Sequence, residues 1–176
     1  NQYVLMDFSQ STVRENSAED VHGHGTHVAG IIRSIFPEVK LMALKYYNPS
    51  ASGVESLNAT LKALKYAIDA GVDIINYSGG GPESSAEELN ILKQAEAKGI
   101  LVVCAAGNDG ANIDNQQHAF YPASYGLRNI ISVSAYDPEL KTVSSSNFGT
   151  HSVHISAPGY RIKSSLPHGR AGYLTG

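Results

Sequence analysis

Apolar runs of strand length alternate with segments of helical periodicity along this chain, and this alternation constrains the fold more than any other feature. The segment 56–70 carries four apolar residues spaced four, three and four apart, which form one face of a helix: Leu57, Leu61, Leu64 and Ile68. Ser56 is the expected N-cap of this helix, and Gly71 is expected to end it.

A second helix is predicted over 84–98, where Glu87 and Glu88 near its start and Lys98 at its end complement the helix dipole. Strands are predicted at 3–6, 39–44, 72–77, 100–105, 129–135 and 153–157, and polar loops at 7–20 and 48–53. Strands that alternate with helices indicate an α/β fold, in which helices cover both faces of a mostly parallel sheet.

Three histidines fall within six residues in the stretch 21–32. Small residues separate them, and the glycines before His27 allow the backbone to turn tightly. Val28, Ala29, Ile31 and Ile32 then read as the buried side of a helix that ends before Pro37. A histidine at a loop-to-helix junction has an exposed ring on a fixed backbone, which suits a general base.

Small residues also follow three of the predicted strands, in the segments 78–81, 105–108 and 157–159. In open parallel sheets, ligands bind beyond the carboxyl ends of the strands. Neither the dinucleotide-binding glycine pattern nor the P-loop pattern is present. Taken alone, these segments are read as tight turns.

The segment His24-Gly25-Thr26-His27-Val28-Ala29-Gly30 resembles the histidine motif of the subtilisin-like serine proteases. The resemblance extends from about residue 20 to residue 176 and includes the family-like segments 121–125 and 156–159. It implies a three-layer sandwich and a serine endopeptidase, with His24 as the catalytic base and His27 as a structural histidine. Asn108 would stabilise the oxyanion, because a side-chain amide can donate to the charged oxygen of a tetrahedral intermediate.

The resemblance also implies substrate-binding residues. Ser78, Gly79, Gly80 and Ala105, Ala106, Gly107 would form the two walls of the primary specificity cleft, and Phe120 would stand at its floor. Gly53, Val54 and Glu55 match the family's edge strand, which pairs with extended substrate. A phenyl ring at the floor predicts a preference for small or medium substrate side chains.

Two elements of the family pattern fall outside the chain. The nucleophile belongs to a Gly-Thr-Ser-Met-Ala-like segment, and such a segment would begin where this chain ends, at Thr175-Gly176. The family's aspartate precedes the histidine by about thirty residues, a position before Asn1. Asp7 is a weak candidate for that role. The chain is therefore expected to be a single domain segment over 1–176, incomplete at both ends and inactive alone.

Composition excludes several other classes. The net charge is −3, which is no electrostatic footprint for nucleic acid, and no apolar run reaches the length of a membrane span. Cys104 is the only cysteine, so no internal disulfide can form. No cofactor is expected. The usual calcium-binding insertion after the histidine helix is not visible, although calcium elsewhere in the parent protein stays open. The resemblance favours secretion, and an intracellular location stays open.

The expected partners are a peptide or protein substrate and, in the parent protein, a propeptide or the remaining parts of the domain. Two other functions compete with the protease. A non-catalytic relative would keep the cleft as a peptide-binding module. A metal hydrolase would use His22, His24 and His27 as ligands, although their spacing fits no familiar zinc pattern.

Overall fold

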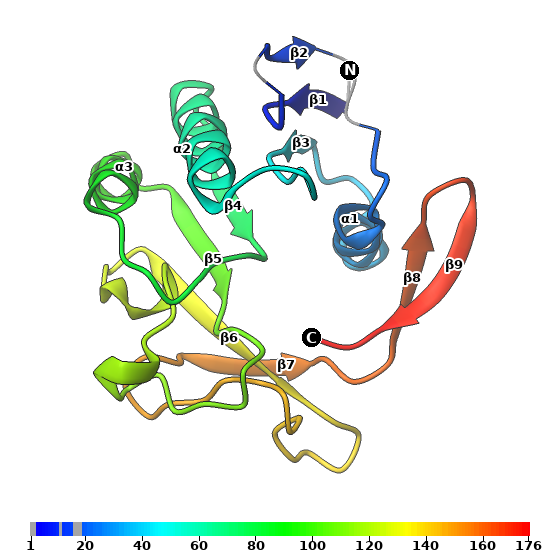
Figure 1. The fold of residues 1–176 in the computed structure, drawn as a ribbon. Coiled ribbons are helices and arrows are strands. Elements are labelled where there is room, and N and C mark those ends of the chain that lie inside the picture. Colours follow the sequence, from blue (N-terminus) through cyan, green and yellow to red (C-terminus); the bar gives the residue numbers. More distant parts are fainter. Residues whose placement is uncertain (1–2, 11, 16–18) are drawn as a thin grey trace. The chain divides into compact units, whose positions relative to one another are not determined.

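The computed structural model describes residues 3–10, 12–15 and 19–176. They form two compact units, the first from residues 1–69 and 163–173 and the second from residues 70–162 and 174–176. Figure 1 labels the elements of both units. The predicted strand–helix alternation is confirmed as an α/β arrangement, with one parallel strand pair in the first unit and three in the second.

The first unit contains a three-stranded sheet of order β2-β1-β3. Strand β1 (Tyr3–Asp7) pairs parallel with β3 (Leu41–Lys45) and antiparallel with the short β2 (Arg14–Glu15). Strand β2 lies in the segment 7–20 that was predicted as a loop; residues 11 and 16–18 of that segment lie outside the described residues. Buried Met6 and Phe8 pack with Ala59 and Ala63 of helix α2.

Helix α2 (Gly53–Asp69) begins earlier than predicted, and the prediction that residues 53–55 form a substrate-binding edge strand is therefore wrong. Gly53, Val54 and Glu55 form its first turn and are not an edge strand. The reason is a capping box: Ser52 Oγ accepts a hydrogen bond from Glu55 N at 3.3 Å, and the Glu55 carboxylate accepts one from Ser52 N at 2.8 Å. Ser52, and not Ser56, therefore occupies the capping position, and a substrate strand cannot pair with this segment.

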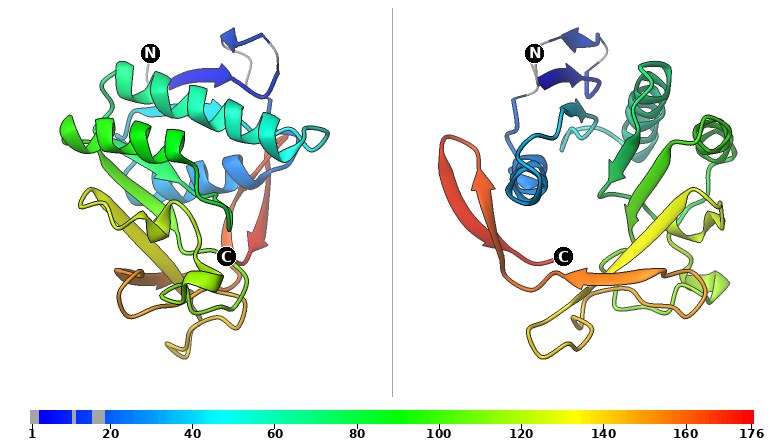
Figure 2. Two further views of the ribbon diagram at one scale, coloured as in Figure 1. Left: turned by 60° about the vertical axis from the view of Figure 1, so that its left-hand side comes forward. Right: turned by 180° about the vertical axis from the view of Figure 1, so that it is seen from behind.

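Helix α1 (His24–Ile35) lies against a hairpin that the sequence did not predict, formed by β8 (Ile162–Leu166) and β9 (Arg170–Leu174). Both views in Figure 2 show the hairpin beside the helix. Ser164 Oγ donates to the carbonyl oxygen of His27 at 2.7 Å. The hairpin thus holds the helix that carries the histidine motif.

The second unit is built on a four-stranded parallel sheet of order β4-β5-β6-β7. These strands span Ile74–Tyr77, Leu101–Ala105, Ile130–Tyr136 and Ile155–Pro158. Helix α3 (Ala86–Ala97) lies beside β5 in Figure 1, and the short 3₁₀ helices η1 (Gln116–His118) and η2 (Ala123–Tyr125) connect β5 to β6. All four strand predictions in this unit are confirmed to within two residues.

Glu88 does more than complement the dipole of α3. Its side chain is buried, and its carboxylate accepts hydrogen bonds from the hydroxyls of Tyr77 at 2.9 Å and Tyr125 at 2.8 Å. The carboxylate therefore ties β4, α3 and η2 together.

Burial, together with the charge of Glu88, raises the pKa of the Cys104 thiol to about 12, so this cysteine stays protonated and unreactive at neutral pH.

Candidate functional site

His24 is the first residue of α1, at the loop-to-helix junction that the sequence predicts. Gly23 precedes it with φ 96°, a left-handed conformation that other residues rarely adopt. The Asp20 carboxylate accepts hydrogen bonds from the backbone N–H groups of His22, Gly23 and Thr26, at 3.0, 2.7 and 2.8 Å. It also accepts one from the Thr26 hydroxyl at 2.6 Å. One carboxylate thus fixes the whole turn before the helix.

The His24 residue is exposed, whereas the backbone of the turn before it is fixed by Asp20. Neighbouring protein atoms remove water from part of the ring, and this desolvation, together with the nearby His22, lowers the pKa of His24. The Asp20 carboxylate opposes the shift. The neutral imidazole, which is the form that can accept a proton, is therefore favoured near neutral pH.

His27 has the structural role that the family resemblance implies. It is only 3% exposed, and its Nε2 lies 3.3 Å from the carbonyl oxygen of Gly172 in β9. A buried ring turned toward the hairpin is not available as a ligand beside His22 and His24. Among the residues that the structure describes, no three His, Cys, Asp or Glu side chains are placed to hold a metal ion.

Asp7 ends β1 and is 6% exposed. Its carboxylate accepts hydrogen bonds from Ser9 N at 2.8 Å and Ser9 Oγ at 2.6 Å, and it lies 3.4 Å from Lys45 Nζ. Burial raises the pKa of Asp7, but the Ser9 hydrogen bonds and the Lys45 charge outweigh burial and lower it. Ser9 and Lys45 are thus the partners of the Asp7 carboxylate in this structure, and a role of Asp7 as the orienting aspartate stays a prediction.

The segment 78–81 follows β4, and the segment 105–107 begins at the last residue of β5. Because β4 and β5 are adjacent parallel strands, both segments lie at the same edge of the sheet. Gly81 and Tyr121 form an antiparallel bridge, with N–O distances of 3.0 and 2.8 Å. A Cβ on Gly80 would lie 2.6 Å from Phe120 Cε1, and a Cβ on Gly107 would lie 2.9 Å from Phe120 Cδ2. The Phe120 ring is thus in contact with both predicted walls.

Asn108 follows these small residues and is exposed. A Cβ on Gly176 would lie 3.5 Å from Asn108 Nδ2, so the amide lies beside the last residue of the chain. Gly176 N donates to the carbonyl oxygen of Gly159 at 3.0 Å. The second unit therefore places together the segment that carries Asn108, the small-residue segment 157–159, and residues 174–176.

Two residues that support these positions were not identified from the sequence. Asp20 stands four residues before His24, and its proximity to a glycine-rich turn could have indicated a capping role. Asn147 is 1% exposed, and its amide bonds to the segment 106–111. No local pattern marks Asn147, because its partners lie 36 to 41 residues away.

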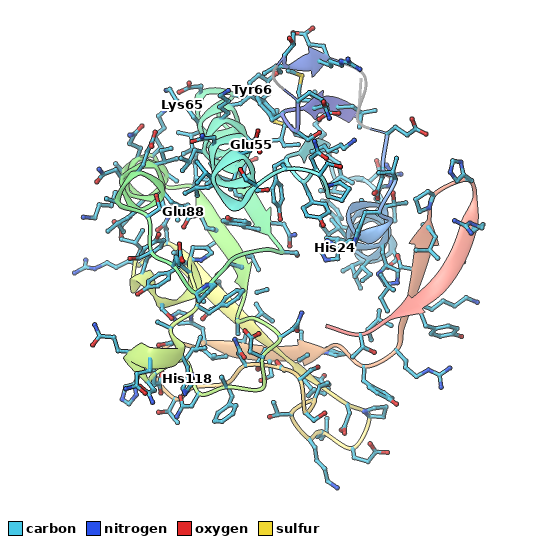
Figure 3. All side chains as sticks on the ribbon, viewed as in Figure 1. His24, Glu55, Lys65, Tyr66, Glu88 and His118 are labelled. Carbon is cyan, nitrogen blue, oxygen red and sulfur yellow. The ribbon has the colours of Figure 1, made fainter. Side chains whose placement is uncertain are left out.

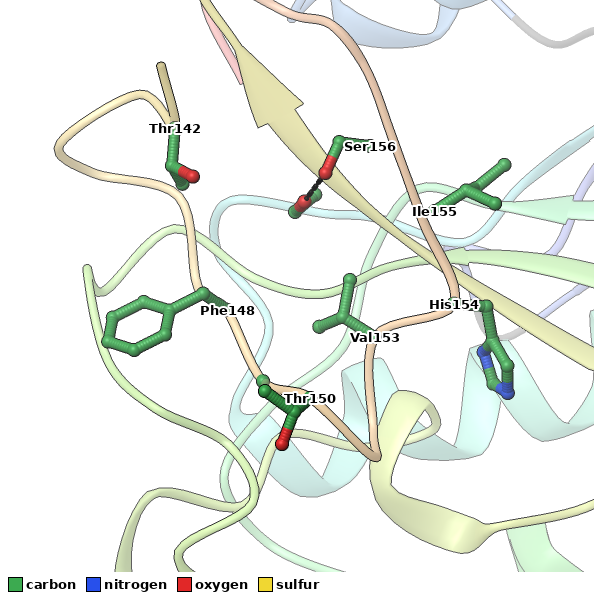
Figure 4. Close-up of a pocket in the computed structure, with 9 residues that line it drawn as sticks. Thr142, Phe148, Thr150, Val153, His154, Ile155 and Ser156 are labelled. Carbon is green, nitrogen blue, oxygen red and sulfur yellow. Dashed lines mark hydrogen bonds between the residues drawn. The ribbon is translucent and has the colours of Figure 1, made fainter. Parts of the chain in front are cut away.

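A hollow of about 290 Å³ lies elsewhere in the second unit, beside β6 and β7 (Figure 4). Its lining includes Phe148, Thr150, His154 and a hydroxyl pair, Ser134 Oγ and Ser156 Oγ, which lie 2.6 Å apart. None of the residues predicted to bind substrate lines this hollow.

Among the described residues, no helix is long and apolar enough to cross a membrane.

Residues 5–175 match the Subtilase family, peptidase family S8. The chain is 34% identical over 172 residues to the major intracellular serine protease of Bacillus subtilis, covering 93% of this chain and 53% of that protein. It is 36% identical over 162 residues to subtilisin DY of Bacillus licheniformis, covering 87% of this chain and 57% of that protein. The chain thus spans about half the length of the curated relatives it matches.

Among solved structures, the S41 psychrophilic protease is similar with a TM-score of 0.81 and 27% sequence identity. The match covers 97% of this chain and 63% of that structure. The protease domain of PatA, as an S218A mutant, gives a TM-score of 0.80 at 23% identity, a likeness of fold alone.

Proposed function

Because this chain belongs to the subtilase family of serine endopeptidases, we propose that it supplies the general base and the oxyanion donor of a peptide-bond hydrolase. His24 is the base and Asn108 is the donor. The serine nucleophile and the aspartate that orients His24 belong to the parent protein outside residues 1–176, so the chain alone is inactive.

The reaction uses the chemistry that each group can perform. Neutral His24 accepts the proton of the serine hydroxyl as that oxygen attacks the peptide carbonyl, and it later donates the proton to the leaving amine. The carbonyl oxygen becomes negative in the tetrahedral intermediate, where the Asn108 amide N–H stabilises it. In the second half of the reaction, His24 accepts a proton from water as the water attacks the acyl-enzyme, and it then returns the proton to the serine oxygen.

The observation that carries this proposal is the placement of Asn108. Its exposed amide lies beside Gly176, the residue at which the family's nucleophile segment would begin. A capping asparagine would use its amide on the local turn, whereas the amide of Asn108 faces a separate segment of the chain. The contact of Phe120 with the walls at Gly80 and Gly107 supports a primary cleft at the same edge of the sheet.

The proposed substrate is a peptide or protein whose cleaved residue has a small or medium side chain. The phenyl ring of Phe120 contacts both walls and occupies volume that a large substrate side chain would need. Ser78, Gly79, Ala105 and Ala106 contribute the rest of the cleft. Gly53, Val54 and Glu55 have no part in it, because they belong to α2.

The test compares this chain with its parent protein. Both are incubated with a fluorogenic peptide and a serine-directed phosphonate, and labelled sites are identified by mass spectrometry. We expect the parent to cleave the peptide and to be labelled at one serine outside residues 1–176, and the isolated chain to show neither result. A folded parent that is neither labelled nor active would instead make this a non-catalytic peptide-binding relative. Labelling within 1–176 with turnover would contradict the proposed position of the nucleophile.

A further inference from the structure

The segment that carries Asn108 is held by one distant side chain. Asn147 Nδ2 donates to the carbonyl oxygen of Ala106 at 2.9 Å, and its Oδ1 accepts from the backbone N–H groups of Asp109 at 2.9 Å and Ala111 at 3.0 Å. These three bonds lie on both sides of Asn108. The loop is therefore fixed before and after the residue that presents its amide.

The Asn147 amide is fully used. An asparagine side chain offers two acceptor sites on oxygen and two N–H donors on nitrogen. Asp109 and Ala111 occupy the oxygen, and the nitrogen reaches Ala106 and, at 3.4 Å, Asp109 Oδ2. The donors and acceptors around it determine which end is nitrogen. An aspartate of the same size would turn an oxygen toward a carbonyl oxygen and a carboxylate.

Two backbone hydrogen bonds also join the segment that contains Asn147 to the loop that carries Asn108. Asn147 N donates to the carbonyl oxygen of Gly107 at 2.9 Å, and Phe148 N donates to that of Ala111 at 3.0 Å. Gly107 has φ 105°, and a Cβ there would overlap Asn147 Nδ2. The residue immediately before Asn108 thus packs directly on the buried amide, which leaves the loop little room to shift.

We propose that Asn147 is a positioning residue for the oxyanion donor. It touches neither substrate nor reacting atoms, and it acts by fixing the backbone from which Asn108 projects. This inference rests on the proposed function of Asn108. Because a displacement of about 1 Å at a catalytic group can reduce a rate by about 10²-fold, loss of the Asn147 contacts should lower kcat by roughly 10- to 100-fold.

The experiment is a double-mutant cycle in the parent protein, with Asn147→Asp and Asn108→Ala made singly and together. Active-site titration gives kcat per active molecule, so a smaller folded fraction does not change the result. We expect Asn147→Asp to lower kcat by roughly 10- to 100-fold alone and by less than about threefold when Asn108 is already alanine. Asn147→Ser supplies the same cycle where Asn147→Asp gives no folded protein.

A matched control is Asn115→Asp. Asn115 is exposed, and its Oδ1 accepts from Gln117 N at 3.1 Å, a bond that aspartate also forms, so its kcat should be unchanged. Equal losses from Asn147→Asp in both backgrounds, or an unchanged kcat, would overturn the inference and leave Asn108 in its role. If Asn108→Ala itself leaves kcat unchanged, the proposed function fails instead, so the two failures are distinguishable.

Discussion

The two regions that present the candidate catalytic groups are fixed in contrasting ways. Around His24, one carboxylate holds the turn from within the same short segment, since Asp20 bonds to residues two to six positions away. Around Asn108, the support comes from Asn147, more than thirty-five residues further along the chain. Both devices leave the functional side chain exposed and place the polar support behind its backbone.

The difference decides what each region needs in order to form. The Asp20 hydrogen bonds that shape the turn before His24 can form as soon as their own segment is made, because Asp20 and its partners all lie within residues 20–26. The Asn108 loop requires β6 and the segment after it to be in place, because Asn147 lies beyond that strand. Changes elsewhere in the domain should therefore disturb the Asp20 hydrogen bonds less than they disturb the Asn147 hydrogen bonds.

The largest expected loss of activity comes from substitution of His24, the exposed histidine beside the turn that Asp20 holds. In the parent protein, His24→Ala removes the proposed base, and kcat should fall by about 10⁶-fold, the loss found for the catalytic histidine of subtilisin. His118→Ala is the matched control, since His118 is an exposed histidine on η1 in the other unit (Figure 3). Steady-state kinetics on both variants checks this, and a His24→Ala enzyme within tenfold of parental kcat would contradict the assignment.

The next prediction concerns substrate preference and the second region, where Phe120 contacts the predicted walls of the cleft. Phe120→Gly removes the ring that touches Gly80 and Gly107, and the cleft should then accept larger side chains. Since pocket volume discriminates by roughly 10- to 200-fold, kcat/KM for a peptide with Phe at the cleaved position should rise at least about tenfold relative to Ala. Peptide-library profiling of the parent and the variant measures the ratio. An unchanged profile would place Phe120 outside the specificity cleft.

A smaller effect tests the local carboxylate. Partial burial raises the pKa of Asp20, but hydrogen bonds from the Thr26 hydroxyl and nearby backbone N–H groups outweigh burial and lower the pKa to about 2. Because the folded pKa lies below the unfolded value, Asp20 stabilises the fold above about pH 4, and this stabilisation is lost as the pH falls toward 2.

Asp20→Asn should therefore destabilise the parent protein at pH 7 by about 1 kcal/mol, a figure reduced for the solvent screening of a partly exposed group. The difference from the unmodified protein should shrink between pH 5 and pH 3. Urea unfolding at each pH gives the free energies. A difference that stays constant across this range would show that the charge of Asp20 does not hold the turn.

The smallest effect concerns a local contact without burial. Lys65 Nζ and Asp69 Oδ2 lie 3.0 Å apart on α2, four residues apart and both more than half exposed. Exposed pairs of this kind contribute about 0.3–0.5 kcal/mol. Lys65→Ala in the parent protein should shift the free energy of unfolding by no more than about 0.5 kcal/mol. A larger change would mean that local contacts in this unit stabilise more than their exposure allows.

Structural features that depend on residues close together in the sequence could mostly be predicted. The periodicity of Leu61, Leu64 and Ile68 gave α2, and all three side chains are buried. The histidine motif gave the junction at His24 and the buried, structural His27. Both features depend on neighbouring residues, so a reading of the sequence can find them.

The incorrect or missing predictions have two physical causes: one local pattern that was overlooked, and contacts between residues that lie far apart in the sequence. The segment 53–55 was assigned a strand by family resemblance, but a capping box with Ser52 makes it the first turn of α2. Glu88 was read as a dipole charge, but its partners Tyr77 and Tyr125 lie 11 and 37 residues away. Asn147 gave no signal at all, because its meaning depends entirely on the loop that the fold brings to it.

The central claim is that the second region presents Asn108 to charge that exists only in the transition state. The most direct test measures kcat, KM and Tm on one preparation of Asn108→Ala in the parent protein. The account predicts that kcat falls by roughly 10²- to 10³-fold, the range for loss of one oxyanion-hole donor in subtilisin, while KM and Tm stay nearly unchanged. A folded Asn108→Ala enzyme with kcat within a few-fold of the parent, and a lowered Tm, would show that Asn108 only caps a turn.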